Sequence, residues 1–440
     1  MNNVSFAVSC ALAVIAIEGS ARALRAETKH SPTSHFPSYT GRVMCGYQGW
    51  FRAEGDGSGD GWSHYSERGP LAAATLHPDF WPDITDYETT YPTSLTNQDG
   101  STVRVFSSWD QSTTDLHFRW MQQYGIDGAF VQRFFSGLRS PQGRKKSRVV
   151  LENAVRASGR YGRAFAVMYD LSGLKNNGED CSVLIQDWKE LVDEVKVTSQ
   201  ATNHYLYHRG KPLVVIWGLG FPDRGYDIQK IGIDKVIDFL KHDPNYGGCS
   251  VMLGVPTYFR DLNVDTNPDP YLHKLIESAD VVMPWMVQRF TPLVHLFDTP
   301  RYEEQVKADL AWCAARGLDY APCVYPGFSW HNMHSHGRGD AMIFPLNQIP
   351  RQRGRFYWNL ISAAIEAKAG MLYVAMFDEM DEGTAIFKCA NNPPAGVSLC
   401  DYEGLPTDHY LWLTGEAGKM LRGEIPFSRQ QPARSDAGGH

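Results

Sequence analysis

Eight short apolar runs, most of them rich in β-branched residues, recur along the chain. They occupy Val43–Tyr47, Gly128–Gln132, Ala164–Tyr169, Leu213–Trp217, Ser250–Val255, Val281–Trp285, Tyr320–Tyr325 and Met371–Phe377. Strands that are buried on both faces of a parallel sheet show this continuous apolar pattern rather than an alternating one. The pattern therefore predicts eight parallel strands.

Segments with the helical period of apolar residues lie between most of these runs. They are Asp115–Tyr124, Ser147–Tyr161, Val183–Lys196, Ile233–Lys241, Tyr271–Glu277, Tyr302–Arg316 and Gly354–Lys368, and a last segment spans Tyr410–Leu421. Strands that alternate with helices pair in parallel. Eight strands and about eight helices fit a (β/α)8 TIM barrel, an α/β fold.

The chain of 440 residues is longer than a typical barrel of about 250 residues, so the fold requires long βα loops. Two such loops follow the first and seventh runs, at Phe51–Asp110 and Pro326–Arg351, and both are rich in Gly, Pro, Asp, His and Trp. We predict a single domain over residues 27–428, followed by a disordered polar tail at 429–440.

Composition narrows the class of protein. Apolar residues make up 43% and charged residues 21% of the chain, which is typical of a globular protein with a large core. The formal charge of −7 and the lack of a long basic run argue against a nucleic-acid partner. Twelve Trp and 21 Tyr are compatible with stacking on sugar rings, although large cores also use aromatic residues.

The N-terminus carries an apolar stretch, Val4–Ile17, followed by small residues. It is too short to span a bilayer and resembles a secretory signal peptide, so we assign residues 1–26 to one and expect a secreted or periplasmic protein with no membrane span. In that compartment Cys389 and Cys400, which bracket a loop rich in Asn, Pro and Gly, are the best candidates for a disulfide.

The last apolar run ends in four carboxylates within five residues, Asp378-Glu379-Met380-Asp381-Glu382. Functional groups gather at the carboxyl ends of barrel strands. If the chain turns after Phe377, the Cβ atoms of Glu379 and Glu382 come to about 5–6 Å on one face. Carboxyl groups about 5 Å apart suit a retaining glycoside hydrolase, whereas about 6.5–9.5 Å suits an inverting one. Proximity also separates their pKa values, so that one is an acid and the other a base. The alternative is a helix N-terminus bearing acids that complement its dipole.

The surroundings of this pair resemble glycoside hydrolase family 99 and the related family 71, which include endo-α-mannosidase-related TIM-barrel proteins. The family-99 motif Glu-Trp-His-Glu-Gly-Thr is similar to Glu379-Met380-Asp381-Glu382-Gly383-Thr384, where Met-Asp replaces Trp-His. Further similar segments are Gly46–Phe51, Tyr124–Phe130, Tyr325–Phe328 and Arg353–Trp358.

The resemblance implies an O-glycosyl hydrolase that acts with retention on an α-linked glycan, with an α-mannoside as the first candidate. In that family the first glutamate deprotonates the 2-hydroxyl of the substrate to give a 1,2-anhydro sugar, and the second protonates the leaving oxygen and then activates water. Carried over, Glu379 is the base and Glu382 the acid/base. Direct nucleophilic attack by Glu379 stays open.

Other residues at or beyond the predicted strand ends are candidates for binding an oligo- or polysaccharide. They are Tyr47, Trp50, Gln132, Arg133, Tyr169, Asp170, Trp217, Trp285, Tyr325, Trp330 and His331. For each, the alternative is barrel packing or loop support, and Arg133 could pair with Asp170 instead of a sugar.

No cofactor or metal is required by this interpretation. Two loops nevertheless carry possible metal ligands: Glu54–Trp62, whose alternating acids faintly resemble a calcium loop, and the His331, His334, His336 cluster with Asp340. We interpret the first as a lid carrying Trp62 and His64, and the second as a polar loop over the cleft. The alternatives to a glycosidase are a non-catalytic carbohydrate-binding barrel and a metal-dependent hydrolase.

Overall fold

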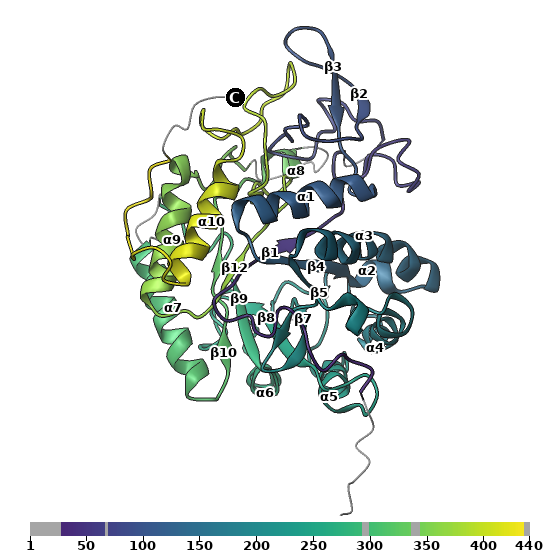
Figure 1. Ribbon diagram of the computed structural model, residues 1–440, viewed down its shortest axis with the longest axis vertical. Coiled ribbons are helices and arrows are strands. Elements are labelled where there is room, and N and C mark those ends of the chain that lie inside the picture. The colour runs from purple at the N-terminus through teal and green to yellow at the C-terminus, as the bar shows by residue number, and fades with distance from the viewer. Residues whose placement is uncertain (1–27, 67–68, 293–298, 336–343, 435–440) are drawn as a thin grey trace, which may run out of the picture.

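The computed structural model describes residues 28–66, 69–292, 299–335 and 344–434. A parallel sheet runs through its centre, and most of the helices lie around it (Figure 1). In chain order the strands of this sheet are β1 (Val43–Tyr47), β4 (Gly128–Phe134), β5 (Ala164–Asp170), β7 (Lys211–Trp217), β8 (Ser250–Pro256), β9 (Val281–Trp285), β10 (Asp319–Tyr320), β11 (Cys323–Val324) and β12 (Leu372–Val374). All eight predicted strands are therefore present.

The sheet closes on itself through the seventh predicted strand. Its first half, β10, pairs with β9, and its second half, β11, pairs with β12. Ala321 donates from its backbone to the Val282 carbonyl, and Tyr373 donates to the Pro322 carbonyl, so the ladder continues across the break. β12 also pairs with β1, which completes the predicted (β/α)8 barrel.

The described helices are α1 (Gln111–Tyr124), α2 (Phe135–Leu138), α3 (Pro141–Tyr161), α4 (Ser182–Glu190), α5 (Ile233–His242), α6 (Tyr271–Glu277), α7 (Thr299–Ala314), α8 (His331–Ser335), α9 (Arg355–Glu366) and α10 (His409–Leu421). Eight of the described helices correspond to predicted segments, whereas the short helices α2 and α8 were not predicted. α4 continues into a π-helical turn at Leu191–Val195. In α3 the Ser140 side chain accepts from the Gly143 amide at the N-terminus, and Gly162 ends the helix in the left-handed conformation.

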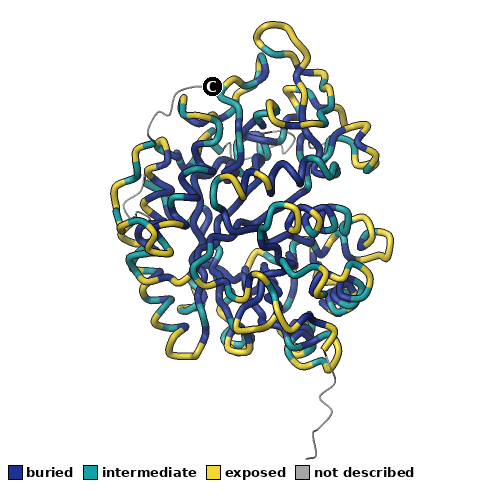
Figure 2. The backbone as a smooth tube through the Cα atoms, in the orientation of Figure 1, coloured by how far each residue is buried: buried dark blue, intermediate teal, exposed yellow. Residues whose placement is uncertain are grey.

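The barrel strands are the most buried part of the molecule (Figure 2). Every residue of β5 and β8 is buried. This burial on both faces is the physical reason for the continuous apolar runs in the sequence. Among the described residues, no helix combines the length and the apolar character that crossing a bilayer requires.

The loop after β1 is the long insertion that the sequence indicated. It contains an antiparallel hairpin of β2 (Tyr91–Thr96) and β3 (Thr102–Val105), which projects from the barrel in Figure 1. A second short antiparallel pair joins β6 (Tyr207–His208) to β7.

Both ends of the chain are only partly described. The predicted signal peptide, residues 1–26, lies outside the described residues. At the other end, Arg434 in the predicted tail forms an ion pair with Asp408, and the Trp358 indole donates to the Ser428 carbonyl, so residues 428–434 contact the domain.

The predicted disulfide between Cys389 and Cys400 is not present. Both are buried free thiols. The Cys389 thiol contacts the Tyr402 hydroxyl, and the Cys400 thiol contacts Ser329, so the two side chains are held by different neighbours. Spacing around a turn-rich loop indicated that the two segments are close, but it could not set the directions of the side chains.

Candidate active site

The acidic segment turns away from the barrel directly after β12. The amide of Phe377 donates to the Gly46 carbonyl at 2.8 Å, which continues the contact with β1 for one more residue. Asp378 then accepts from the backbone amides of Gln48 and Gly49, both at 2.8 Å. Because Asp378 is fully buried, these donors compensate for the water that its carboxylate loses. They also fix the segment to the end of β1.

Glu379 is held by two side-chain donors. The Gln48 amide donates to its Oε1 and the Thr384 hydroxyl donates to its Oε2, each at 2.9 Å. The amides of Thr384 and Ala385 donate to the Glu379 backbone carbonyl and close the turn. Only 2% of the residue is exposed, so its orientation is set by protein groups.

Glu382 lies on the same turn but is more open. Its carbonyl accepts from the Ser329 amide at 3.0 Å, while its side chain is partly exposed to the cavity described below. Gly383 follows with φ of +65°, and a Cβ at this position would lie 2.8 Å from the Ser329 nitrogen. Only glycine therefore fits between Glu382 and Thr384.

Arg351 supports the turn from behind. Its Nη2 donates to the carbonyls of Gly383 and Ala385 at 2.8 and 2.7 Å. The buried guanidinium lies over the rings of Phe80, Tyr402 and Tyr410. It thus fixes the backbone without forming an ion pair with either glutamate.

The carboxyl groups of this segment are electrostatically strained. Burial raises the pKa of Asp378 to about 7. Burial and the neighbouring Glu382 raise the pKa of Glu379 well above its usual range, and burial and Asp381 raise the pKa of Glu382 to about 8. Two adjacent carboxylates out of water cannot both be charged at little cost, so the pair favours holding a proton near neutral pH.

Both glutamates lie in the wall of a cavity of about 770 Å³ at the carboxyl ends of the strands. This volume is in the range of small-ligand sites, about 300–1,000 Å³. Seven of the eleven predicted binding residues also line it: Trp50, Gln132, Arg133, Asp170, Trp217, Trp285 and Trp330. The structure therefore brings together segments that are separated by more than half of the chain.

The other four predicted binding residues are not among the lining residues. The buried Tyr47 hydroxyl bonds to His117 Nδ1, and the Tyr169 hydroxyl donates to Asp187. The Tyr325 hydroxyl bonds to the Phe290 carbonyl, and His331 Nδ1 bonds to the Phe344 carbonyl. Each position is near a strand end, but the side chain is directed to a partner in the protein.

Arg133 and Asp170 do not pair with each other. Arg133 forms a buried ion pair with Asp187 of α4, with Nε to Oδ2 at 2.8 Å. Asp170 accepts from the Ser172 amide, and burial raises its pKa. Asp170 thus faces the cavity as a carboxyl group without an ion-paired partner among the described residues.

The prediction of binding residues missed several that line the cavity or hold the glutamates. Gln48, Arg52, His64, Phe134, Arg224 and Arg289 line the cavity, and Thr384 holds Glu379. Gln48 and Thr384 lie inside the segments that resemble family 99, so the motif carried a signal for them. Arg224 and Arg289 lie in loops after β7 and β9, where the sequence has no distinctive pattern.

The two loops with possible metal ligands use those side chains within the protein. Asp56 accepts from the Ser107 hydroxyl and the Ser58 amide, and Asp60 pairs with Lys146. In the second loop the ring of His334 lies 4.4 Å from that of Trp330, while His336 and Asp340 lie outside the described residues.

Comparison with known proteins places this geometry in context. No family model matches the chain. A glycoprotein endo-α-1,2-mannosidase-like protein of Danio rerio is 28% identical over 111 residues, which are 24% of this chain and 23% of that protein. The glycoprotein endo-α-1,2-mannosidase of Mus musculus is 29% identical over 129 residues, which are 28% of this chain and 26% of that protein. The matches thus span about a quarter of the curated relatives.

Solved structures match over most of the chain. The GH99 endo-α-mannosidase from Bacteroides thetaiotaomicron has a TM-score of 0.58 at 16% identity, covering 88% of this chain and 99% of that one. Its complex with bis-tris-propane has a TM-score of 0.59 at 15% identity, with the same coverage. This likeness shows the fold, and together with the curated relatives it confirms the resemblance to family 99.

Proposed function

We propose that this protein is a retaining glycoside hydrolase that cleaves an α-linked glycan, with an α-mannoside as the first candidate substrate. The observation that carries the proposal is that Glu379 and Glu382 lie on one tight turn and line one cavity. Burial raises the pKa of both carboxyl groups. Such a pair supplies the acid and the base that glycoside hydrolysis requires.

The surroundings of the two glutamates support the proposed roles. Gln48 donates to Oε1 of Glu379 and Thr384 donates to Oε2. Such donors favour the charged form of a carboxyl group. Glu382 is the more open of the two to the cavity, with the Trp330 indole as its nearby donor, so it is the group that can pass a proton to the leaving oxygen. Glu379 is the base and Glu382 the acid.

In the first step Glu379 takes the proton of the sugar 2-hydroxyl, and O2 attacks C1. The glycosidic C1–O bond breaks as Glu382 gives its proton to the leaving oxygen, leaving a 1,2-anhydro sugar. In the second step Glu382 deprotonates water, which attacks C1, and Glu379 returns its proton to O2. Two inversions at C1 give net retention. Direct attack of Glu379 on C1 also gives retention and is the alternative route.

The walls of the cavity suit a sugar. Trp217, Trp285 and Trp330 supply flat apolar faces for pyranose rings. The buried indole nitrogens of Trp50 and Trp217 and the Oε1 of Gln132 form no hydrogen bond within the described residues. These groups are available to bond sugar hydroxyls, which supports a neutral, hydroxyl-rich ligand.

Replacement of either glutamate tests the proposal. Aryl α-glycosides and yeast, plant and algal polysaccharides are first screened with the wild-type protein by product analysis. We expect Glu379→Gln and Glu382→Gln each to lower turnover by about 10³-fold, because each removes one proton-transfer group. Glu304→Gln, the same change at an exposed position on α7, is the control.

Circular dichroism establishes that the variants are folded. Wild-type turnover in either active-site variant would refute the assigned roles. Glycan binding by the wild-type protein without any hydrolysis would instead identify a carbohydrate-binding barrel.

A further inference from the structure

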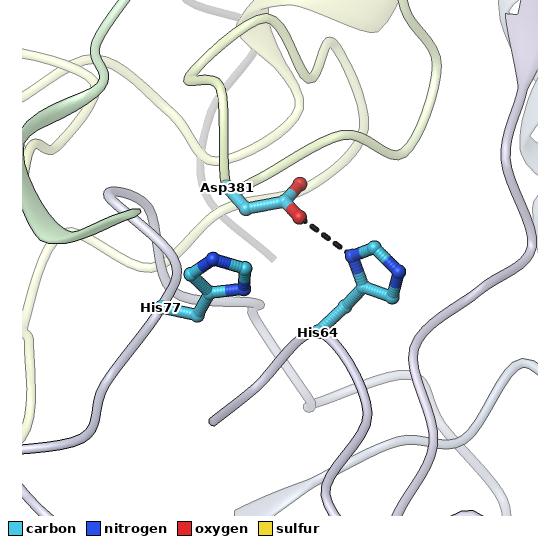
Figure 3. A group of neighbouring side chains, drawn as sticks. All are labelled: His64, His77 and Asp381. Carbon is cyan, nitrogen blue, oxygen red and sulfur yellow. Dashed lines mark hydrogen bonds and ion pairs between the residues drawn. The ribbon is translucent and has the colours of Figure 1, made fainter. Parts of the chain in front are cut away.

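Next to the catalytic turn, two histidines and an aspartate converge. His64 and His77 come from the long loop after β1, and Asp381 comes from the acidic segment after β12 (Figure 3). One potential ligand atom from each lies within 4.8 Å of the others. We propose that these three side chains form a binding site for a divalent transition-metal ion, with Zn²⁺ as the best fit.

Backbone hydrogen bonds link the three segments that carry these side chains. The His77 amide donates to the Tyr65 carbonyl at 3.0 Å, which ties His77 to the neighbour of His64. The amides of Asp79 and Phe80 donate to the Met380 carbonyl, which ties the same segment to the neighbour of Asp381. The three positions are therefore held together by the chain itself, before any ion binds.

The buried carboxyl group of Asp381 has a hydrogen-bond partner on only one of its two oxygens within the described residues. The side chain is completely buried, and its Oδ2 bonds to His64 Nδ1 at 2.8 Å. Its Oδ1 is buried and forms no hydrogen bond within the described residues. Burying a carboxylate is costly unless it is well paired or coordinates a metal, and one imidazole satisfies only part of its capacity. A cation at this position would supply the remaining interaction.

The ring of His64 is oriented for this contact. It stacks on the Trp50 indole at 3.8 Å between ring centres, with 8° between the planes. The centre of the His77 ring lies 6.1 Å from that of the His64 ring. Figure 3 shows the Asp381 carboxyl group above the two rings, with His77 on the left and His64 on the right. A zinc ion would take the place of the hydrogen between His64 Nδ1 and Asp381.

The set of ligand atoms selects the kind of ion. Two imidazole nitrogens and one carboxylate oxygen are the donors that Zn²⁺ prefers, with water as a fourth ligand, whereas Ca²⁺ and Mg²⁺ prefer oxygen alone. Tetrahedral bonds of about 2.0–2.1 Å require ligand atoms roughly 3.3 Å apart, so the cluster needs only a small contraction.

The ion would join two loops rather than take part in the proposed reaction. His64 lines the cavity, but His77 and Asp381 are not among the lining residues. Zinc at this position would fasten the long loop after β1 to the turn that carries Glu379 and Glu382. The inference therefore does not rest on the proposed function.

Metal analysis of the purified full-length protein tests the site. After treatment with chelator and dialysis against ZnSO₄, we expect about one Zn²⁺ per chain. At roughly a hundredfold excess over the dissociation constant, bound Zn²⁺ should raise the melting temperature by about 3 °C. Both effects should be lost in His77→Ala and in Asp381→Asn, and His77→Asn serves if the alanine variant does not fold.

A matched control is available on the surface. His242 and Asp238 form an exposed His–Asp pair on α5 with Nδ1 to Oδ1 at 2.9 Å, and no third ligand joins them in the part of the chain that the structure describes. His242→Ala should keep the full zinc content, and so should Glu382→Gln. No zinc in the wild-type protein, or equal zinc in His77→Asn and Asp381→Asn, would overturn the proposal.

Discussion

Four neighbouring carboxyl groups have four different environments in this protein. Backbone amides hold Asp378, the side chains of Gln48 and Thr384 hold Glu379, and His64 bonds to Asp381. Glu382 alone is left partly open to the cavity. The donor that each group accepts from therefore distinguishes these carboxyl groups, although all four are acidic.

Thr384→Val tests the role of one donor. Valine keeps the shape but removes the hydroxyl that donates to Glu379 Oε2, a bond to a charged group with a net worth of about 1.5–3 kcal/mol. Without it the charged form of Glu379 is less favoured, so its pKa rises. We expect the acid limb of the pH–rate profile to move to higher pH and kcat to fall by about tenfold.

Thr414→Val is the matched change in α10, where the hydroxyl bonds to the Tyr410 carbonyl far along the chain from the turn. It should leave the pH–rate profile in place. An unchanged acid limb in Thr384→Val would show that this hydroxyl does not tune Glu379.

Glu382→Gln tests the raised pKa through stability. The folded pKa of Glu382, about 8, is above its usual value, so folded protein keeps a proton that unfolded protein loses as the pH rises. The contribution of Glu382 to the free energy of unfolding is thus greatest at low pH. It falls by at most about 1.4 kcal/mol per pH unit between the unfolded and the folded pKa of this group. The glutamine variant lacks this loss.

Urea unfolding between about pH 5 and pH 8 measures the difference. The free energy of unfolding of Glu382→Gln should gain on the wild-type value as the pH rises. Glu304→Gln should track the wild type throughout. A constant difference between Glu382→Gln and wild type would contradict the raised pKa.

At the scale of elements, the strands and helices followed from the sequence because burial imposes a regular pattern. β1 and β9 have the predicted bounds, and α6 does as well. The last strand is shorter than its apolar run, because Met376 donates to the Thr384 carbonyl instead of a neighbouring strand and interrupts the regular ladder, although Phe377 still donates to Gly46. Apolar character reports burial, and it does not report where strand pairing stops.

The candidate site followed from the sequence only in part. The glutamate pair and the tryptophans at strand ends were found from position and residue type. Tyr47 and Tyr169 were predicted to bind the sugar, but they are not among the residues that line the cavity, and their hydroxyls bond to His117 and Asp187. His64 was predicted as part of a lid, but its place in the cavity wall depends on how a long loop folds back, which local patterns do not encode.

Gly383→Ala tests the turn that presents the two glutamates. Alanine is strained at φ of +65° and would also place its Cβ 2.8 Å from the Ser329 nitrogen. We expect a loss of about 3 kcal/mol in the free energy of unfolding. Gly404→Ala shares a positive φ, +71°, but has open space around it, so it should lose only about 1 kcal/mol. Equal losses would show that the contact with Ser329 does not constrain the turn.

At the scale of the whole molecule, a closed barrel brings distant loops around one cavity. The wall combines Trp50 after β1, Asp170 at the end of β5, Trp285 at the end of β9 and Glu382 after β12. The barrel fixes the positions of the strand ends. The long loop after β1 adds His64 to the wall of the cavity. The fold thus supplies a rigid frame for a cavity that is lined by aromatic side chains and carboxyl groups.

The configuration of the first product tests the central claim most directly. Hydrolysis of an α-linked substrate found in the screen is followed by proton NMR from its first minutes, before mutarotation mixes the anomers. Either route through Glu379 and Glu382 predicts that the α-anomer appears first, because both involve two inversions at C1. Initial release of the β-anomer would contradict the account.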